Sequence, residues 1–348
     1  MGHDVVIFTS RQFGMPKHEF RNGYEIYRFP ELAHPLENPL TVSMMPTMMG
    51  ADLRRFDVVH AHSHLFFSTN LAALKRKISS TPLVITNHGF RVQRGRWLDL
   101  LQDAYLTTAG SWTLRAADKV ISLTSDEARR VCSLGVHPSK SIVITNGVDV
   151  DLFHPTDEAV DEHTILWAGR FVEEKGVRYL LEAVRLVSKE MPSVRLLVVG
   201  YGPLEDRLKS YAQQLGVSRN VTFQTPVGQT RLASLLNKSA VFALPSLSEG
   251  LPNVVLEAMA CAKPLIATDG IGLNSVIGDA GIFVPPRDPR SLADATLLLL
   301  SDSALRAKLG QHARSIVDRK HSWKVVAEAI TELFQELIQL EEEWDVRS

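Results

Sequence analysis

The sequence has few cysteines, no long apolar run and almost no net charge. Its two cysteines, Cys132 and Cys261, lie far apart in a chain of 348 residues and lack metal-ligand spacing, so a disulfide framework and a zinc site are both unsupported. The 38 basic and 39 acidic side chains nearly cancel, which gives no general attraction to nucleic acid. No apolar run approaches the roughly 20 residues that span a bilayer, and none resembles a signal peptide. We therefore expect a globular protein of the reducing cytoplasm.

Strand-like and helix-like segments alternate along the whole chain. At roughly 100 to 200 residues per domain, the length predicts two domains. Short runs rich in β-branched residues are each followed by a turn and by a stretch with helical apolar spacing. The runs begin at residues 4, 24, 57, 82, 119 and 141 in the first half, and at 164, 195, 221, 240, 264 and 281 in the second. This alternation predicts an α/β protein with two doubly wound parallel sheets.

A polar, acid-rich segment from Val150 to His163 separates the two halves and contains Pro155. We therefore expect one domain at residues 1–150, a second at 151–318 and a closing helical segment at 319–348. Ligands of open α/β sheets bind beyond the carboxyl ends of the strands. The strand-to-helix loops are thus the place to look for chemistry.

Two cations follow the first strand of the second domain. That strand ends in Gly169 and Arg170, and Lys175 precedes a stretch with helical spacing. A guanidinium and an ammonium group beside a helix start suit a phosphate. The alternative is a solvated basic turn.

The next strand runs into a turn that contains Gly200, Gly202 and Pro203. Glycines at a strand exit let a ligand approach the backbone, and proline suits the first helical turn. The turn is not a dinucleotide fingerprint, because Glu205 stands where the third glycine would be. The alternative is a tight structural turn.

A third loop combines two glutamates with a helix start. Glu249 lies in the loop, Pro252 fits the first helical position, and Glu257 follows inside the helix. The free N–H groups near Gly250, Leu251 and Asn253 suit phosphate or sugar oxygens, and the Glu257 carboxylate could accept hydrogen bonds from a ribose diol. The alternative is a capped helix with an ordinary acidic first turn.

Together these segments resemble a known family. The order GRFVEEKG, VVGYGP, VTFQTPVG and PSLSEGLPNVVLEAMACAKP resembles the donor domain of glycosyltransferase family 4, retaining enzymes of the GT-B fold that use nucleotide-activated sugars. ITNGVDVDLFHP resembles the family's interdomain junction, and HSWKVVAEAITELF resembles its closing helix, which crosses back to the first domain.

The resemblance implies a role for each loop. Arg170 and Lys175 would contact the diphosphate, and Glu257 the ribose. Glu249 and the Gly250–Asn253 backbone would contact the donor sugar. The other residues implied at the donor site are Gly169, Gly200, Gly202, Pro203 and, near the base, Val227.

In the first domain, His88 follows the strand run that begins at residue 82. It resembles the family's histidine that faces the donor sugar, which would make it a catalytic residue beside Arg170, Lys175 and Glu249. The alternative is a loop histidine that caps local backbone. Three further histidines, His60, His62 and His64, alternate near a strand end. Without a carboxylate or cysteine partner we favour polar packing over metal binding.

The chain departs from the family pattern at three places. Thr225 replaces a usual glycine, which predicts an altered base pocket. The segment from Asp269 to Ser275 replaces a Gly-Gly-x-Pro-Glu turn, which affects the donor-sugar loop. The family's opening βα unit is also absent before the strand run at residue 4, because a βαβ unit takes roughly 30 residues. We therefore expect an upstream extension or a companion chain to supply it.

Six basic residues and no acidic one lie between Val58 and Leu98. They include Arg91, Arg94 and Arg96, with Phe90 and Trp97 nearby. This stretch predicts contact with an anionic membrane surface or an anionic acceptor, and the alternative is a solvated helix end with a flexible loop.

These observations favour a retaining hexosyltransferase that moves a sugar from a nucleotide diphosphate sugar to a lipid-linked or glycan hydroxyl. Neither a metal ion nor another cofactor is needed, and nucleic acid is not an expected partner. We expect the enzyme in the cytoplasm or peripherally on the inner face of the membrane. The alternatives are a noncatalytic subunit that binds a nucleotide sugar or glycan, and an epimerase or phosphorylase of the same fold.

Overall fold

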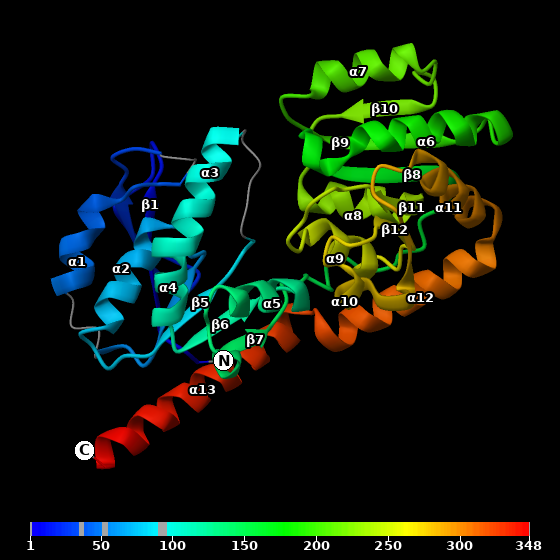
Figure 1. Ribbon diagram of the computed structural model, residues 1–348. Coiled ribbons are helices and arrows are strands. Elements are labelled where there is room, and N and C mark those ends of the chain that lie inside the picture. Colours follow the sequence, from blue (N-terminus) through cyan, green and yellow to red (C-terminus); the bar gives the residue numbers. More distant parts are fainter. Residues whose placement is uncertain (1, 35–37, 51–54, 90–95, 348) are drawn as a thin grey trace. The chain divides into compact units, whose positions relative to one another are not determined.

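The computed structural model describes residues 2–34, 38–50, 55–89 and 96–347 (Figure 1). The chain divides into two compact units. The first comprises Met1–Val143 and Thr331–Ser348, and the second comprises Ile144–Ile330. The units thus divide after Val143, whereas we predicted a boundary after residue 150. The chain returns to the first unit at Thr331, whereas we predicted a closing segment that begins at residue 319.

The first unit contains two separate sheets. One has the order β1-β3-β2, with β1 parallel and β2 antiparallel to β3. The other is fully parallel and has the order β4-β5-β6-β7. The strands are β1 (Val5–Arg11), β2 (His18–Arg21), β3 (Tyr24–Pro30), β4 (Val59–His62), β5 (Leu83–Thr86), β6 (Lys119–Ser122) and β7 (Ser141–Val143). All the predicted strands of this half are present. The antiparallel β2 was not predicted, because its four residues, HEFR, include no β-branched residue.

The helices of the first unit pack against the parallel sheet around a core that includes Leu83, Ile85, Leu114 and Val120. They are η2 (Val42–Met44), α1 (Met45–Gly50), α2 (Phe67–Arg76), α3 (Arg96–Tyr105), η4 (Leu106–Gly110), α4 (Ser111–Ala116), α5 (Ser125–Ser133) and η5 (Pro138–Lys140). The helix predicted over 98–116 contains a π turn at η4. There the Thr108 hydroxyl donates to the Ala104 carbonyl at 2.6 Å. Such side-chain bonds compete with the regular helical ladder, which accords with its widening at this point.

The second unit is built on one six-stranded parallel sheet of order β10-β9-β8-β11-β12-β13. Its strands are β8 (Asp161–Arg170), β9 (Arg195–Tyr201), β10 (Val221–Gln224), β11 (Ser239–Leu244), β12 (Leu265–Thr268) and β13 (Gly281–Val284). Every strand predicted for this half is present. The first strand of the unit, β8, is central, and the strand order reverses between β8 and β11. In such sheets this switch point is where ligands bind.

Helices cover the sheet of the second unit. They are η6 (Glu173–Lys175), α6 (Val177–Glu190), α7 (Glu205–Gln214), α8 (Gln229–Lys238), α9 (Asn253–Ala260), α10 (Asn274–Ile277), η7 (Gly278–Ala280), α11 (Pro289–Ser301) and α12 (Ser303–Lys320). On α6, the buried residues Val177, Leu181 and Val184 recur at helical spacing, which explains why this segment forms an amphipathic helix against the core.

The last helix, α13 (Trp323–Arg347), begins in the second unit and belongs to the first unit from Thr331 onward. Within the first unit, Glu341 accepts a hydrogen bond from Arg76 at 2.9 Å, and Glu336 accepts one from Lys119 at 3.1 Å. The Phe334 ring meets the His60 ring edge-on. These contacts attach the end of α13 to the parallel sheet of the first unit.

Candidate functional site

The loops that follow β8 and β11 meet at the switch point of the second sheet. The Leu247 N–H donates to the Glu174 carbonyl at 2.7 Å, which ties the two loops together. Gly176 has φ +64°, and a Cβ at this position would lie 1.9 Å from the Pro245 carbonyl oxygen. Only glycine allows this approach. Gly176 was not among the predicted site residues, although a glycine directly before a helix is a signal that could have indicated it.

An ion pair joins two of the predicted catalytic residues across these loops. Lys175 Nζ lies 2.7 and 2.6 Å from the two carboxylate oxygens of Glu249. The Ser246 hydroxyl donates to Glu249 Oε1 at 2.6 Å. The Glu249 side chain is only 5% exposed, against 24% for Lys175. Because this ion pair joins them, the roles predicted for Lys175 at the diphosphate and for Glu249 at the sugar are not independent. An ammonium group has three N–H donors, so one remains for a ligand.

Arg170 stands at the carboxyl end of β8 with its side chain exposed. Among the described residues its guanidinium has no ion-pair partner. It is therefore available to an anion that approaches the switch point, where two of its N–H groups can grip two phosphate oxygens.

The glycines at the end of β9 allow close packing of protein backbone. A Cβ on Gly200 would lie 1.9 Å from the Gly169 carbonyl oxygen, and a Cβ on Gly202 would lie 2.6 Å from that of Phe171. The tight structural turn therefore accounts for both glycines, and contact with a donor stays a prediction for them. Pro203 is exposed and precedes α7.

The loop after β11 leads into α9, whose first helical residue is Asn253 and whose N-cap is Pro252. The helix thus begins one residue later than predicted. Asn146 holds this loop, because its Nδ2 donates to the Leu251 carbonyl at 3.3 Å and to Asn253 Oδ1 at 2.9 Å. The sequence analysis assigned no role to Asn146, although it lies in the junction motif. Gly250 completes the loop, and the free N–H groups at the start of α9 can donate hydrogen bonds to an anion.

Glu257 lies in α9, within the same second unit. Burial raises the pKa of its carboxyl group to about 7, and among the described residues no side chain hydrogen-bonds to it. A carboxyl group with such a pKa changes between its neutral and ionised forms near neutral pH. A ligand that binds one of these two forms more strongly would therefore change the protonation of Glu257 near neutral pH.

The remaining predicted donor residues lie on loops of the same sheet edge. Val227 follows β10 and is half-buried, while Thr225 is exposed. The segment that departs from the family pattern is organised by Asp269, whose Oδ1 accepts hydrogen bonds from the Gly270 N–H at 2.8 Å and from Asn274 Nδ2 at 2.9 Å. Asp269 thus shapes the turn between β12 and α10.

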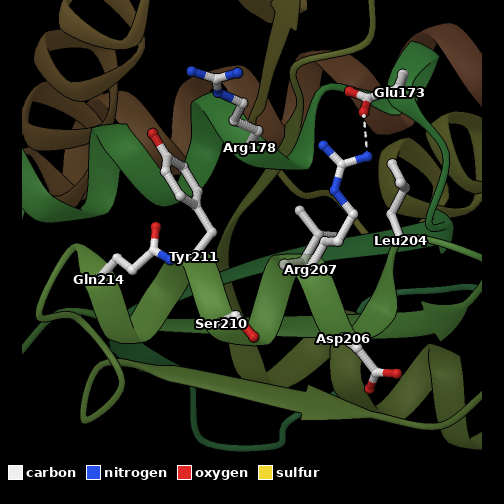
Figure 2. Close-up of a pocket in the computed structure, with 9 residues that line it drawn as sticks. Glu173, Arg178, Leu204, Asp206, Arg207, Ser210, Tyr211 and Gln214 are labelled. Carbon is white, nitrogen blue, oxygen red and sulfur yellow. Dashed lines mark ion pairs between the residues drawn. The ribbon is translucent and has the colours of Figure 1, made fainter.

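Figure 2 shows a surface pocket of about 450 Å³ that is lined by residues of η6, α6, α7 and the turn before α7. Its cations are paired with nearby acids: Arg207 lies 3.5 Å from Glu173, and Arg178 lies 3.0 Å from Glu182. None of the residues predicted to bind the donor lines this pocket. Both arginines that line this pocket are thus paired, whereas at the switch point Arg170 has no ion-pair partner among the described residues.

His88 belongs to the first unit and follows β5. Its Nε2 lies 2.9 Å from His62 Nδ1. The pKa of His88 is lowered to about 4, first by burial of the ring and then by the neighbouring His62, so the ring is neutral at pH 7. His64 is fully buried and hydrogen-bonded to Asn87 at 2.9 Å. In the described part of the chain, no three His, Cys, Asp or Glu side chains gather as a metal site.

Comparisons with known proteins agree on the type of protein. Residues 1–152 match the model of the family described as Glycosyltransferase Family 4, and residues 151–316 match that described as Glycosyl transferases group 1. D-inositol 3-phosphate glycosyltransferase of Mycobacterium tuberculosis is 31% identical over 84% of this chain and 67% of its own length.

Two solved structures are similar in fold. Sucrose-phosphate synthase from Thermosynechococcus elongatus has a TM-score of 0.80 and 24% identity, covering 97% of this chain and 90% of its own. HepE from Anabaena in complex with UDP has a TM-score of 0.79 and 16% identity, and the match covers 96% of this chain and 100% of HepE. The predicted GT-B fold of two Rossmann-like domains is confirmed.

Proposed function

Because the chain belongs to the group 1 glycosyltransferases, we propose that it transfers a sugar. In this proposal it moves a hexose-type residue from a nucleotide diphosphate sugar to a hydroxyl acceptor and retains the anomeric configuration. The observation that carries this proposal is the meeting of the β8 and β11 loops at the switch point, with Arg170, Lys175 and the start of α9. A nucleotide-sugar donor also agrees with the structures of Anabaena HepE that contain UDP and UDP-glucose.

Catalysis in this proposal rests on the leaving group. As the bond between the anomeric carbon and the diphosphate oxygen breaks, negative charge grows on the diphosphate. In the proposal, the Arg170 guanidinium, the third N–H of Lys175 and the free amides before α9 stabilise that charge. The acceptor hydroxyl attacks from the side of the leaving group and gives its proton to the departing diphosphate oxygen, which retains the configuration without a dedicated protein nucleophile.

The function is tested by incubating the protein with labelled nucleotide sugars and with membrane or soluble acceptor fractions. We expect label to enter an acceptor, with the anomeric configuration of the donor retained in the product as measured by NMR. Donor turnover without any acceptor would favour an epimerase, and sugar release that depends on inorganic phosphate would favour a phosphorylase. Donor binding without turnover in any fraction would favour the noncatalytic subunit.

Glu257 is expected to make nucleotide affinity depend on pH. We propose that its carboxylate accepts two hydrogen bonds from the ribose diol, which favours the ionised form. Because the pKa of the free protein's carboxyl group is about 7, binding then releases a proton and affinity should rise about tenfold from pH 6 to pH 8. Calorimetric titration with nucleoside diphosphates measures this.

Glu257→Gln is the matched control for this prediction, because the amide keeps the shape of the side chain and does not titrate. The variant should bind more weakly at pH 8, and its remaining pH dependence should be only that of the nucleotide's own phosphate groups. An equal rise in affinity for both proteins between pH 6 and pH 8 would exclude Glu257 from the ribose site.

We propose a lipid-linked acceptor and peripheral contact with an anionic membrane. In support, α3 exposes Trp97, Leu100 and Leu101 at 79%, 54% and 62%, an apolar group suited to a membrane interface.

The basic stretch between Val58 and Leu98 supports membrane contact less than expected, because Arg76 pairs with Asp118 at 2.7 Å. Phe90, Arg91 and Arg94 lie outside the described residues, as does the side chain of Arg96. Within the described chain, no helix combines the length and apolar character needed to cross a bilayer.

Flotation with anionic vesicles tests this contact. The unmodified protein should float with the vesicles, and it should float less at high salt because exposed charge attraction is screened. The double variant Trp97→Ser, Leu101→Ser should lose most of the vesicle-bound fraction. Phe20→Ser, which removes an apolar side chain that is 74% exposed on β2, is the control. Equal flotation of all three proteins would contradict the proposed surface.

We further propose that a parallel strand from a companion chain fits between β1 and β4. Both are end strands of their sheets, and Phe8 of β1 and Val59 of β4 pack against the same hydrophobic core. An added strand would satisfy the unpaired edges of both. In the purified chain, amides on these two edges should exchange rapidly with solvent. Slow exchange throughout β1 and β4 would contradict the proposal.

A further inference from the structure

Two histidines at the ends of adjacent strands share a hydrogen bond. His62 ends β4, and the register of the parallel pair places it opposite Thr86 of β5. His88 lies two residues beyond Thr86, and extended alternation places residues two apart on the same face of a sheet. His62 Nδ1 and His88 Nε2 are 2.9 Å apart, and the two rings are stacked with centroids 5.2 Å apart.

This hydrogen bond couples the tautomers of the two rings. Partial desolvation of the ring lowers the pKa of His62, and the pKa of His88 is also lowered, so both rings are neutral at pH 7. A bond between neutral imidazoles requires an N–H on one ring and a lone pair on the other. Because Nε2 of His88 is occupied by His62, Nδ1 is the nitrogen of His88 that remains for a ligand. Whether it donates or accepts is set by the tautomer of His62.

We propose that His62 is a positioning residue that fixes the tautomer and ring orientation of His88, and thereby which partner His88 Nδ1 offers to the sugar. The inference rests on the proposed function and on the contact of His88 with the donor sugar that the family resemblance predicts.

His62 packs against the His60 ring, with centroids 4.6 Å apart, but the hydrogen bonds of His62, His60 and His64 differ. His60 is more enclosed, and its Nε2 hydrogen-bonds to Thr86 Oγ1 at 2.7 Å rather than to His88. His64 is fully buried against Asn87. His62 is more exposed than His60 or His64, so its replacement should affect the fold little. A loss of turnover in a His62 variant would then report on His88 rather than on stability.

The test uses two variants of the full chain. His62→Phe removes the hydrogen-bonding nitrogen but keeps a ring to stack, whereas His62→Asn places an amide nitrogen or oxygen near the position of Nδ1. With 15N-histidine labelling, the nitrogen shifts of His88 should change in His62→Phe, which indicates a changed tautomer balance. We expect kcat to fall at least about tenfold, with a donor KM changed less than about twofold and an unchanged melting temperature.

His62→Asn should restore most of the turnover, because the amide can again donate to or accept from His88 Nε2. His18→Phe is the control, since His18 is an exposed histidine of β2 that pairs with Glu25. Unchanged His88 nitrogen shifts in His62→Phe would overturn the proposal. So would a loss of turnover that His62→Asn does not restore.

The nitrogen shifts decide the coupling even if the unmodified chain shows no transfer, because they are measured without substrate. Full activity in His88→Ala would remove the sugar-contacting role of His88, and with it the catalytic part of the inference. Failure of the proposed function and failure of the positioning role therefore give different results.

Discussion

Replacing Lys175 with alanine is expected to lower kcat/KM for sugar transfer by about 100- to 1000-fold, which corresponds to about 2.7–4 kcal/mol of transition-state stabilisation. The substitution has two effects. It removes a positive charge from the diphosphate that departs in the transition state. It also leaves Glu249, only 5% exposed, without its counter-ion and free to repel the diphosphate. Steady-state kinetics with a saturating acceptor measure the loss.

The double variant Lys175→Ala, Glu249→Ala separates these two effects. It removes the repelling carboxylate, so we expect turnover to recover in part while staying well below that of the unmodified enzyme. Full recovery would mean that Lys175 serves only to neutralise Glu249. Unchanged turnover in Lys175→Ala would remove Lys175 from the catalytic site altogether.

Gly176→Ala is expected to reduce the free energy of unfolding of the second unit by about 3 kcal/mol or more. The new Cβ would stand 1.9 Å from the Pro245 carbonyl oxygen, and Gly176 also has φ +64°. The β8 and β11 loops would have to separate, which would stretch the contact between Lys175 and Glu249. Activity should therefore fall even at temperatures where the variant remains folded.

Gly216→Ala provides the matched control. Gly216 has φ +76°, but a Cβ there meets no described atom within 4 Å. It therefore carries the backbone cost without the collision, about 1 kcal/mol. Denaturant unfolding of both variants measures the difference. Equal destabilisation would show that the close approach to Pro245 does not hold the loops together.

The sequence was most informative about the sheets. Runs such as TILWAG and RLLVVG are apolar on both faces, which is typical of buried parallel strands, and they became β8 and β9. The short polar strand β2 gave no such signal. Nor did the π turn in η4, which depends on hydroxyl groups that bond locally to the helix backbone. A pattern of apolar spacing does not reveal where such hydroxyl groups compete with the hydrogen bonds of the helix backbone.

The contacts of the candidate site were not predicted. Lys175 and Glu249 were singled out separately as site residues, but their pairing joins two segments that only the strand order of the sheet brings together. The same holds for His62 and His88, whose contact depends on the register of β4 against β5. Strand order and register are tertiary properties, and residue spacing alone does not specify them.

A crystal structure with a bound nucleoside diphosphate tests the central claim most directly. The account predicts the diphosphate at the switch point, with its oxygens within hydrogen-bonding distance of Arg170 and Lys175 Nζ and near the backbone of Gly250–Asn253. A diphosphate held instead by Arg178 and Arg207 in the pocket between α6 and α7 (Figure 2), with Arg170 and Lys175 not in contact with it, would contradict the account.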